Sequence, residues 1–155
     1  MNSIQSISPI DGRYHAKTAS LSDFFSEYAL MKYRLVVEIE YFIVLAEKKF
    51  FKLTKSEKAF LQSLMDTFDE KAADQIKNIE KTTNHDVKAV EYYIKSAMQE
   101  TSLQDRLEWV HFGLTSQDVN NTAIPMMWRD AMDQSYLPQL LTLSLPFKTM
   151  ALKWM

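Results

Sequence analysis

Hydrophobic residues recur at intervals of three to four positions along most of the chain, and short polar stretches separate these runs. That spacing places the apolar side chains on one face of a helix, so it predicts an all-α fold. The longest run predicts a helix that Ser22 or Asp23 caps and that extends to about Phe51. Its apolar stripe consists of Phe24, Phe25, Tyr28, Met31, Leu35, Ile39, Phe42 and Ile43.

Three shorter amphipathic runs follow, and they predict further helices over about residues 55–67, 68–81 and 87–100. Thr54 and Glu57 have the spacing of a capping box, in which the threonine side chain serves an amide of the first turn and the glutamate reaches back. We interpret these helices as a scaffold that places the polar segments between them.

The last part of the chain carries apolar residues on more than one helical face. From Asp118 the pattern can remain helical to the end, and so wide an apolar surface has to be buried by other helices. Further sequence, partner subunits or both are therefore expected to cover it. Pro125, Pro138 and Pro146 are expected to kink or interrupt this helix, because proline lacks the amide hydrogen.

Composition adds few constraints to this pattern. The 155 residues suit one domain, or one domain and part of another, and a hydrophobic content of 46% is ordinary for a globular protein. A net charge of −2 gives no reason to expect a nucleic-acid partner, and no apolar run is long enough to suggest a membrane span. The absence of cysteine excludes disulfides and thiolate chemistry. The three histidines lack ligand-spaced partners, so no metal site is expected.

Polar chemistry gathers in three segments, of which the stretch from Thr82 to Asp86 directly precedes a predicted helix. Asn84 or Asp86 can cap this helix, because a short polar side chain can accept from the free N–H groups of the first turn. Those N–H groups and the helix dipole also attract anions. His85 lies at the same end as a proton donor or acceptor. We interpret this segment as one wall of a site for an anionic substrate.

The other two segments carry similar chemistry. Ser8-Pro9-Ile10-Asp11-Gly12 has the composition of a turn, and it precedes Arg13, whose planar guanidinium suits carboxylate or phosphate. After Gly113, the residues Thr115 and Ser116 begin a second polar helix N-terminus that can face an anion. The alternative is that Arg13 is a surface arginine beside a turn, and that Thr115 or Ser116 is only a helix cap.

Taken together, the three segments resemble the adenylosuccinate lyases of the fumarase/aspartase superfamily, in the form found in many bacteria. The resemblance rests on residues 8–14, 82–92 and 111–121, in this order and spacing, and it extends along nearly the whole chain as an amino-terminal part. It implies a helical amino-terminal domain over residues 1–114, followed over residues 115–155 by the start of a central bundle of long helices.

The resemblance also implies a function. Such enzymes are carbon–nitrogen lyases of purine and AMP biosynthesis. They cleave adenylosuccinate to AMP and fumarate by β-elimination, and they cleave the corresponding succinylcarboxamide ribotide, without a metal or organic cofactor. Arg13 and Tyr14 then match the nucleotide-binding pair near the phosphate, and Thr115 and Ser116 are expected to hold a succinyl carboxylate. The implied substrate-binding residues are Arg13, Tyr14, Asn84, His85, Asp86, Thr115 and Ser116.

The same resemblance implies groups that these 155 residues do not contain. The general-acid histidine and the serine base of such enzymes lie in later segments, so no catalytic residue is expected here and the chain alone is expected to be inactive. The parent protein is expected to be a cytoplasmic homotetramer, without nucleic-acid or membrane partners, whose active sites combine segments from three subunits. The alternatives are another lyase of the superfamily, such as one acting on argininosuccinate, or a non-catalytic helical interaction module.

Overall fold

The computed structural model describes residues 5–154, which form helices and connecting turns with no strand in that range. The helices of the amino-terminal part are α1 (His15–Thr18), η2 (Ala19–Leu21), α2 (Ser22–Phe25), α3 (Glu27–Glu47), α4 (Lys55–Asp66), α5 (Glu70–Thr83), α6 (Asp86–Met98) and η3 (Gln104–Trp109). They are followed by α7 (Ser116–Ala131), η4 (Met132–Tyr136) and α8 (Leu137–Lys153). The predicted all-α fold is confirmed.

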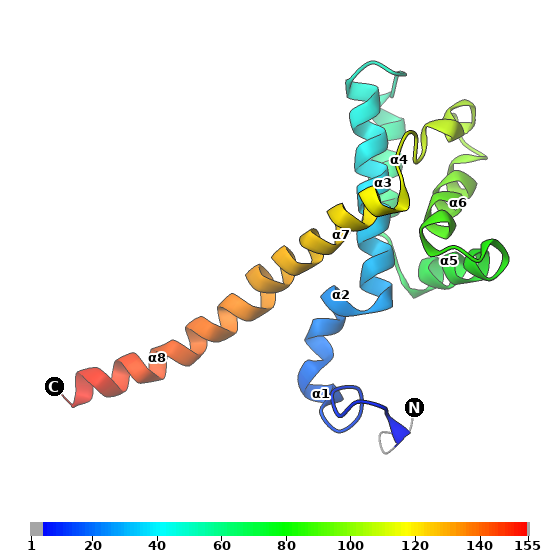
Figure 1. Ribbon diagram of the computed structural model, residues 1–155. Helices are drawn as coiled ribbons and strands as arrows, with labels where there is room; N and C mark the ends of the chain where they lie inside the picture. The colour runs from blue at the N-terminus through cyan, green and yellow to red at the C-terminus, as the bar shows by residue number, and fades with distance from the viewer. Residues whose placement is uncertain (1–4, 155) are drawn as a thin grey trace.

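Helix α3 lies at the centre of the packed part of the molecule, and α7 crosses it (Figure 1). Helices α4, α5 and α6 also contact α3, so one helix carries most of the tertiary packing. Each large apolar side chain that leaves water on this surface stabilises the fold by about 1.5–3 kcal/mol. The core side chains with exposed fractions below 2% include Leu35, Ile39 and Phe42 of α3, Leu61 of α4, Ile76 of α5, and Val87, Val90 and Ile94 of α6.

The helical path is broken at Ser26, which separates α2 from α3. The Ser26 backbone is extended, with φ −83° and ψ 165°, and its Oγ accepts a hydrogen bond from the N–H of Ala29 at 3.1 Å. The expected single helix over residues 22–51, capped at its first residues, is therefore wrong, because the serine side chain offers the backbone a competing partner. Helix α3 also ends earlier than expected, at Glu47, and Lys49 has a left-handed φ of 69°.

The predicted capping box at the start of α4 is confirmed, and its glutamate also binds a distant segment. Glu57 Oε2 accepts hydrogen bonds from the N–H of Thr54 at 2.7 Å and from its hydroxyl at 2.9 Å. Glu57 Oε1 accepts from the Ser102 hydroxyl at 2.8 Å and from Arg106 Nη1 at 2.7 Å. These bonds, above all that from the Thr54 N–H, lower the pKa of the buried Glu57 to about 2. The carboxylate therefore ties α4 to η3.

We expect Glu57→Gln to destabilise the chain by about 3 kcal/mol at neutral pH, the free energy that separates a pKa of about 2 from the ordinary 4.5. Because the folded-state pKa is depressed, this stability is present above the unfolded-state pKa and is lost as the pH falls from 4.5 towards 2. Urea unfolding of the wild type and Glu57→Gln, at about pH 7 and about pH 3, measures the difference, which should shrink by about half.

The control for this measurement is Glu47→Gln. Glu47 forms an exposed ion pair with Lys58, so its replacement is expected to change stability by less than about 1 kcal/mol. A destabilisation by Glu57→Gln that is equally large at both pH values would contradict the assignment, because it would come from lost packing and not from the charge of the carboxylate.

The last three helices continue one another without a non-helical residue between Ser116 and Lys153 (Figure 1). The expected interruption at Pro125 and Pro146 is wrong: both lie inside regular helix, where each proline removes one backbone hydrogen bond. Pro138 is the second residue of α8 and lies two residues after the end of the π-helical η4, so its missing N–H also falls within the continuous helical path. The irregular part of the helical path from Ser116 to Lys153 is therefore the π-helical turn η4.

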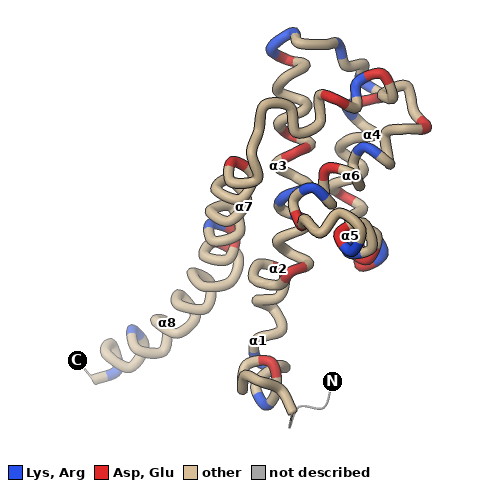
Figure 2. Tube along the Cα trace, turned by 45° about the vertical axis from the view of Figure 1, so that its right-hand side comes forward, with Lys and Arg blue, Asp and Glu red and all other residues tan. Residues whose placement is uncertain are grey.

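Helix α8 has no buried residue, and its apolar side chains remain exposed as the hydrophobic pattern predicts. Figure 2 shows α8 almost without charged positions, apart from lysines towards its carboxyl end. The exposed apolar side chains of α8 include Leu140, Leu141, Leu143, Leu145, Phe147, Met150 and Leu152. Even so, none of the helices within residues 5–154 has an apolar stretch of the length and hydropathy that a bilayer crossing requires.

Candidate functional site

The N-terminus of α6 is built by two residues with separate tasks. Asn84 ends α5 in the left-handed conformation, with φ 52°, and its N–H donates to the carbonyl of Glu80 at 2.7 Å. His85 is the cap of α6, because its Nδ1 accepts from the N–H of Lys88 at 3.2 Å. The expected cap at Asn84 is therefore wrong, whereas Asp86 does accept from a first-turn N–H, that of Val87 at 2.9 Å, although it lies one residue after the cap position. With Nδ1 used as an acceptor, the neutral imidazole carries its proton on Nε2.

The N-terminus of α7 follows a loop with two left-handed residues, His111 at φ 62° and Gly113 at φ 69°. Thr115 caps the helix and forms a capping box: the Asp118 carboxylate accepts from the Thr115 N–H and from its hydroxyl, both at 2.7 Å. These bonds, led by that from the threonine hydroxyl, lower the pKa of Asp118. The Thr115 hydroxyl is thus committed within the protein. Ser116 presents the hydroxyl that remains available.

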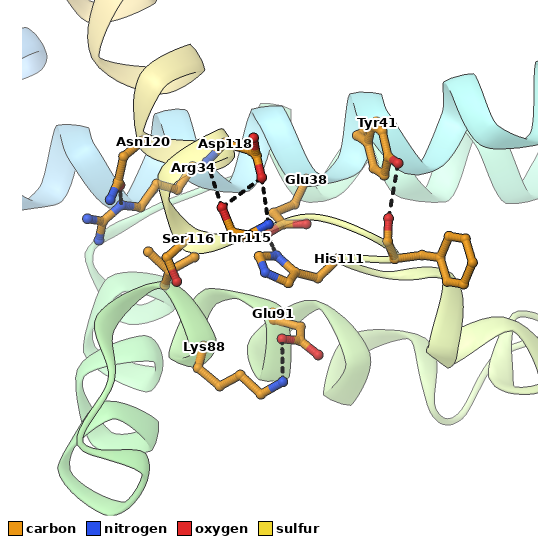
Figure 3. Close-up of polar contacts among 12 residues, drawn as sticks. Arg34, Glu38, Tyr41, Lys88, Glu91, His111, Thr115, Ser116, Asp118 and Asn120 are labelled. Atoms are coloured by element: carbon orange, nitrogen blue, oxygen red, sulfur yellow. Dashed lines mark hydrogen bonds and ion pairs between the residues drawn. The ribbon is translucent and has the colours of Figure 1, made fainter.

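The two helix N-termini meet beside α3. His85 Nε2 lies 3.4 Å from Ser116 Oγ. Arg34 of α3 reaches both helices, because its Nη2 lies 2.8 Å from Asp86 Oδ2 and its Nε donates to Asn120 Oδ1 at 2.9 Å. Figure 3 shows Arg34 beside Asn120. Burial alone would raise the pKa of Asp86, but hydrogen bonding by the backbone and the charge of Arg34 outweigh it and lower that pKa. The side chain of Asp86, predicted to contact substrate, is therefore the counter-ion of Arg34.

Two buried carboxylates lie beside this junction (Figure 3). Glu38 of α3 lies 2.5 Å from Nδ1 of His111, and Glu91 of α6 pairs with Lys88 at 2.9 Å and with Lys95 at 3.0 Å. Burial raises the pKa of Glu38. Burial acts in the same direction on Glu91, but hydrogen bonds and charge from the two lysines outweigh it and lower its pKa.

The junction has the properties of an anion-binding site. Within residues 5–154, the N–H groups of Ser116 and Gln117 make no hydrogen bond to the protein, as is usual in the first turn of a helix. These N–H groups lie at the positive end of the α7 dipole. The Ser116 hydroxyl and the Nε2–H of His85 lie beside them. Lys88, whose side chain is 43% exposed, adds a cation from α6. The junction therefore offers several donors to a carboxylate or phosphate.

The third predicted segment lies elsewhere. Arg13 and Tyr14 are exposed, and the Arg13 guanidinium lies over the Tyr14 ring at 5.4 Å. The turn before them is confirmed by hydrogen bonds from the Gly12 N–H to the Ser8 carbonyl and from the Tyr14 N–H to the Pro9 carbonyl. Figures 1 and 2 both show this segment beyond the amino end of α3, away from α6 and the start of α7. The structure thus brings together two of the three predicted segments within one copy of the chain.

Arg34 and Glu38 are parts of the junction that were not predicted from the sequence. They lie four residues apart on α3, next to the fully buried Leu35 and Ile39, and both are themselves buried. A charged side chain inside an apolar stripe costs free energy unless it is paired. Their position in the stripe is therefore the signal that could have found them, whereas their partners on other helices follow only from the fold.

Comparison with known proteins identifies the family. The family described as lyase matches residues 12–154 of the chain. An adenylosuccinate lyase of Dictyostelium discoideum is 47% identical over 163 residues, covering 99% of this chain and 35% of the relative. The enzymes of the same name from Legionella pneumophila (strain Corby) and Escherichia coli (strain K12) are 45% and 40% identical, and each match covers 89% of this chain and 31% of the relative. The chain spans about a third of the length of these curated relatives. By the extent of the family match, the chain is a member of the lyase family.

Proposed function

We propose that this chain is the amino-terminal part of an adenylosuccinate lyase, which cleaves adenylosuccinate to AMP and fumarate and also acts on the succinylcarboxamide ribotide. The relatives that match 89–99% of the chain carry that name. The observation in the structure that carries the proposal is the meeting of the α6 and α7 N-termini, where the Ser116 hydroxyl and Nε2 of His85 lie 3.4 Å apart. A helical interaction module has no need of such a junction.

The proposed chemistry explains why these donors converge. Removal of a proton next to a succinyl carboxylate places a second negative charge on that carboxylate group, and the C–N bond then breaks as the departing nitrogen takes up a proton. Donors that are already oriented stabilise such charge without reorganising, and removing one of them typically costs a factor of about 100–1,000 in rate. In this proposal the α7 N-terminus and Ser116 hold a succinyl carboxylate, Thr115 fixes that N-terminus as its cap, and Asn84 and His85 face the remainder of the substrate. The groups that move the protons come from sequence outside residues 1–155.

The remaining parts of the proposal concern assembly. Arg13 and Tyr14 bind the nucleotide phosphate in a site completed by another subunit of a cytoplasmic homotetramer, since they lie away from the junction in one copy. Residues 115–155 belong to the central bundle of that tetramer, and residues 1–114 form the amino-terminal domain. The exposed apolar surface of α8 supports this assignment, because such a surface needs helices from elsewhere to cover it.

A chimaera tests the proposed activity. Residues 1–155 replace the matching third of the Dictyostelium discoideum enzyme, and cleavage of adenylosuccinate is followed by ultraviolet absorbance. We expect turnover by the chimaera and none by the 155-residue chain alone. Circular dichroism and sedimentation check that the chimaera folds and assembles. A folded, assembled chimaera without turnover would contradict the proposal, and faster cleavage of argininosuccinate than of adenylosuccinate would favour the other lyase of the superfamily.

A further inference from the structure

Glu38 is the most unusual buried group in the molecule. Its side chain is 0% exposed, and it lies on α3 between fully buried apolar residues. One carboxylate oxygen, Oε1, contacts Nδ1 of His111, and the other, Oε2, has no hydrogen-bond partner among the described residues. A buried polar group with an unused lone pair costs free energy, and an apolar side chain of similar volume serves stability better. The arrangement therefore calls for a role beyond holding helices together.

His111 is held in a strained backbone conformation. Its φ of 62° lies in the left-handed region, which a residue with a side chain adopts at a cost of about 1–3 kcal/mol unless its surroundings impose it. The side chain is 16% exposed, and Nε2 makes no hydrogen bond to any residue in the range 5–154. Figure 3 shows the ring between Glu38 of α3 and Glu91 of α6, in the region where Ser116 and Lys88 also lie. One ring nitrogen is thus occupied, and the other is free for a ligand.

The charged groups around the ring determine where its protons lie. Glu91 and its two partners, Lys88 and Lys95, face the pair from α6, and Asp118 acts on His111 from α7. Both lysines are already engaged by Glu91, so the imidazole is the partner that can neutralise Glu38. Burial raises the pKa of Glu38 and so favours a neutral Glu38–His111 pair. In a neutral pair one proton lies between Oε1 and Nδ1, and Nε2 carries the second proton, whichever of the two residues holds the first.

We propose that Glu38 is a positioning residue that orients His111 and keeps its Nε2 as a hydrogen-bond donor to an anionic oxygen of the ligand bound at the α6 and α7 N-termini. The role deepens the proposed function and rests on it, because that function supplies a ligand with both carboxylate and phosphate oxygens. Glu38 itself does not touch the ligand. It acts through the ring, in the way that a carboxylate behind a metal-bound or catalytic histidine fixes the tautomer and direction of the imidazole.

Nuclear magnetic resonance of the 155-residue chain tests this proposal without requiring turnover. We expect a proton resonance far downfield of the amide region that correlates with His111 Nδ1, as short hydrogen bonds to carboxylates produce. The signal should disappear in Glu38→Leu, which removes the acceptor, and should move upfield without disappearing in Glu38→Gln, whose amide oxygen is a weaker acceptor. Glu40→Gln is the matched control, because Glu40 is an exposed glutamate on the same helix. A structural role alone does not predict rescue of this signal by glutamine.

Ligand binding supplies the second readout, with fumarate added in one arm and inorganic phosphate in the other. We expect the His111 Nε2 signal to shift in at least one arm, which identifies the oxygen it meets, and the affinity in that arm to fall about tenfold in Glu38→Leu but not in Glu40→Gln. Absence of the downfield signal in the wild type, or a shift in neither arm, overturns the proposal. If Glu38→Leu does not fold, the comparison uses Glu38→Gln, whose weaker acceptor must weaken binding. An inactive chimaera with these signals present would instead refute the lyase function alone.

Discussion

Replacing Asp86 with alanine is expected to destabilise the chain by about 3 kcal/mol, although the Asp86 side chain is 53% exposed. The reason lies with its partner. The Arg34 side chain is 7% exposed, and a guanidinium buried to that extent costs free energy unless it is paired. Without Asp86, this guanidinium retains only the amide oxygen of Asn120 as a partner among the described residues. Urea unfolding monitored by circular dichroism measures the loss, because helix content reports the transition.

Two further variants separate the charge from the packing. Arg34→Met removes the buried cation itself, so it is expected to cost less than Asp86→Ala, and the double variant Arg34→Met/Asp86→Ala is expected to be more stable than Asp86→Ala alone. Asp74→Ala serves as the control for losing an exposed aspartate from a helix and is expected to change stability by less than about 0.5 kcal/mol. A double variant less stable than Asp86→Ala would show that the cost does not come from an unpaired buried cation.

The helices of this chain follow well from its hydrophobic spacing, whereas several of their ends do not. The stripe along α3 and the capping box of Thr54 and Glu57 both depend on residues close together in the sequence. The break at Ser26 depends on a choice between two partners for one backbone N–H, and the apolar pattern continues through it unchanged. The regular helix around Pro125 and Pro146 shows the opposite case, since the remaining hydrogen bonds outweigh the one that each proline removes.

In the candidate site, too, the sequence predicts local features but not the contacts between residues that are far apart in the chain. The chemistry of the α6 and α7 N-termini is readable from sequence, because caps and hydroxyls precede amphipathic helices. The roles of individual residues depend on partners that are far away in the chain: Asp86 pairs with Arg34, and His111 pairs with Glu38. His85, and not Asn84, is the N-cap of α6, because Asn84 has the left-handed conformation at the end of α5. The convergence of Arg13 and Tyr14 with this junction stays a prediction, because one copy of the chain keeps them apart.

Replacing His85 with asparagine in the chimaera is expected to lower kcat/KM for adenylosuccinate by a factor of about 100–1,000 while leaving stability nearly unchanged. His85 uses Nδ1 to cap α6 and presents Nε2 towards Ser116. Asparagine is also a good capping residue, so the substitution keeps the first function and removes the second. His85→Ala removes both, and it should therefore show the same kinetic loss together with about 1 kcal/mol of destabilisation. Steady-state kinetics and urea unfolding on the same preparations separate the two effects. If His85→Asn retained full turnover while His85→Ala lost stability, the imidazole would be a helix cap alone, and the junction of α6 and α7 would no longer support a substrate site.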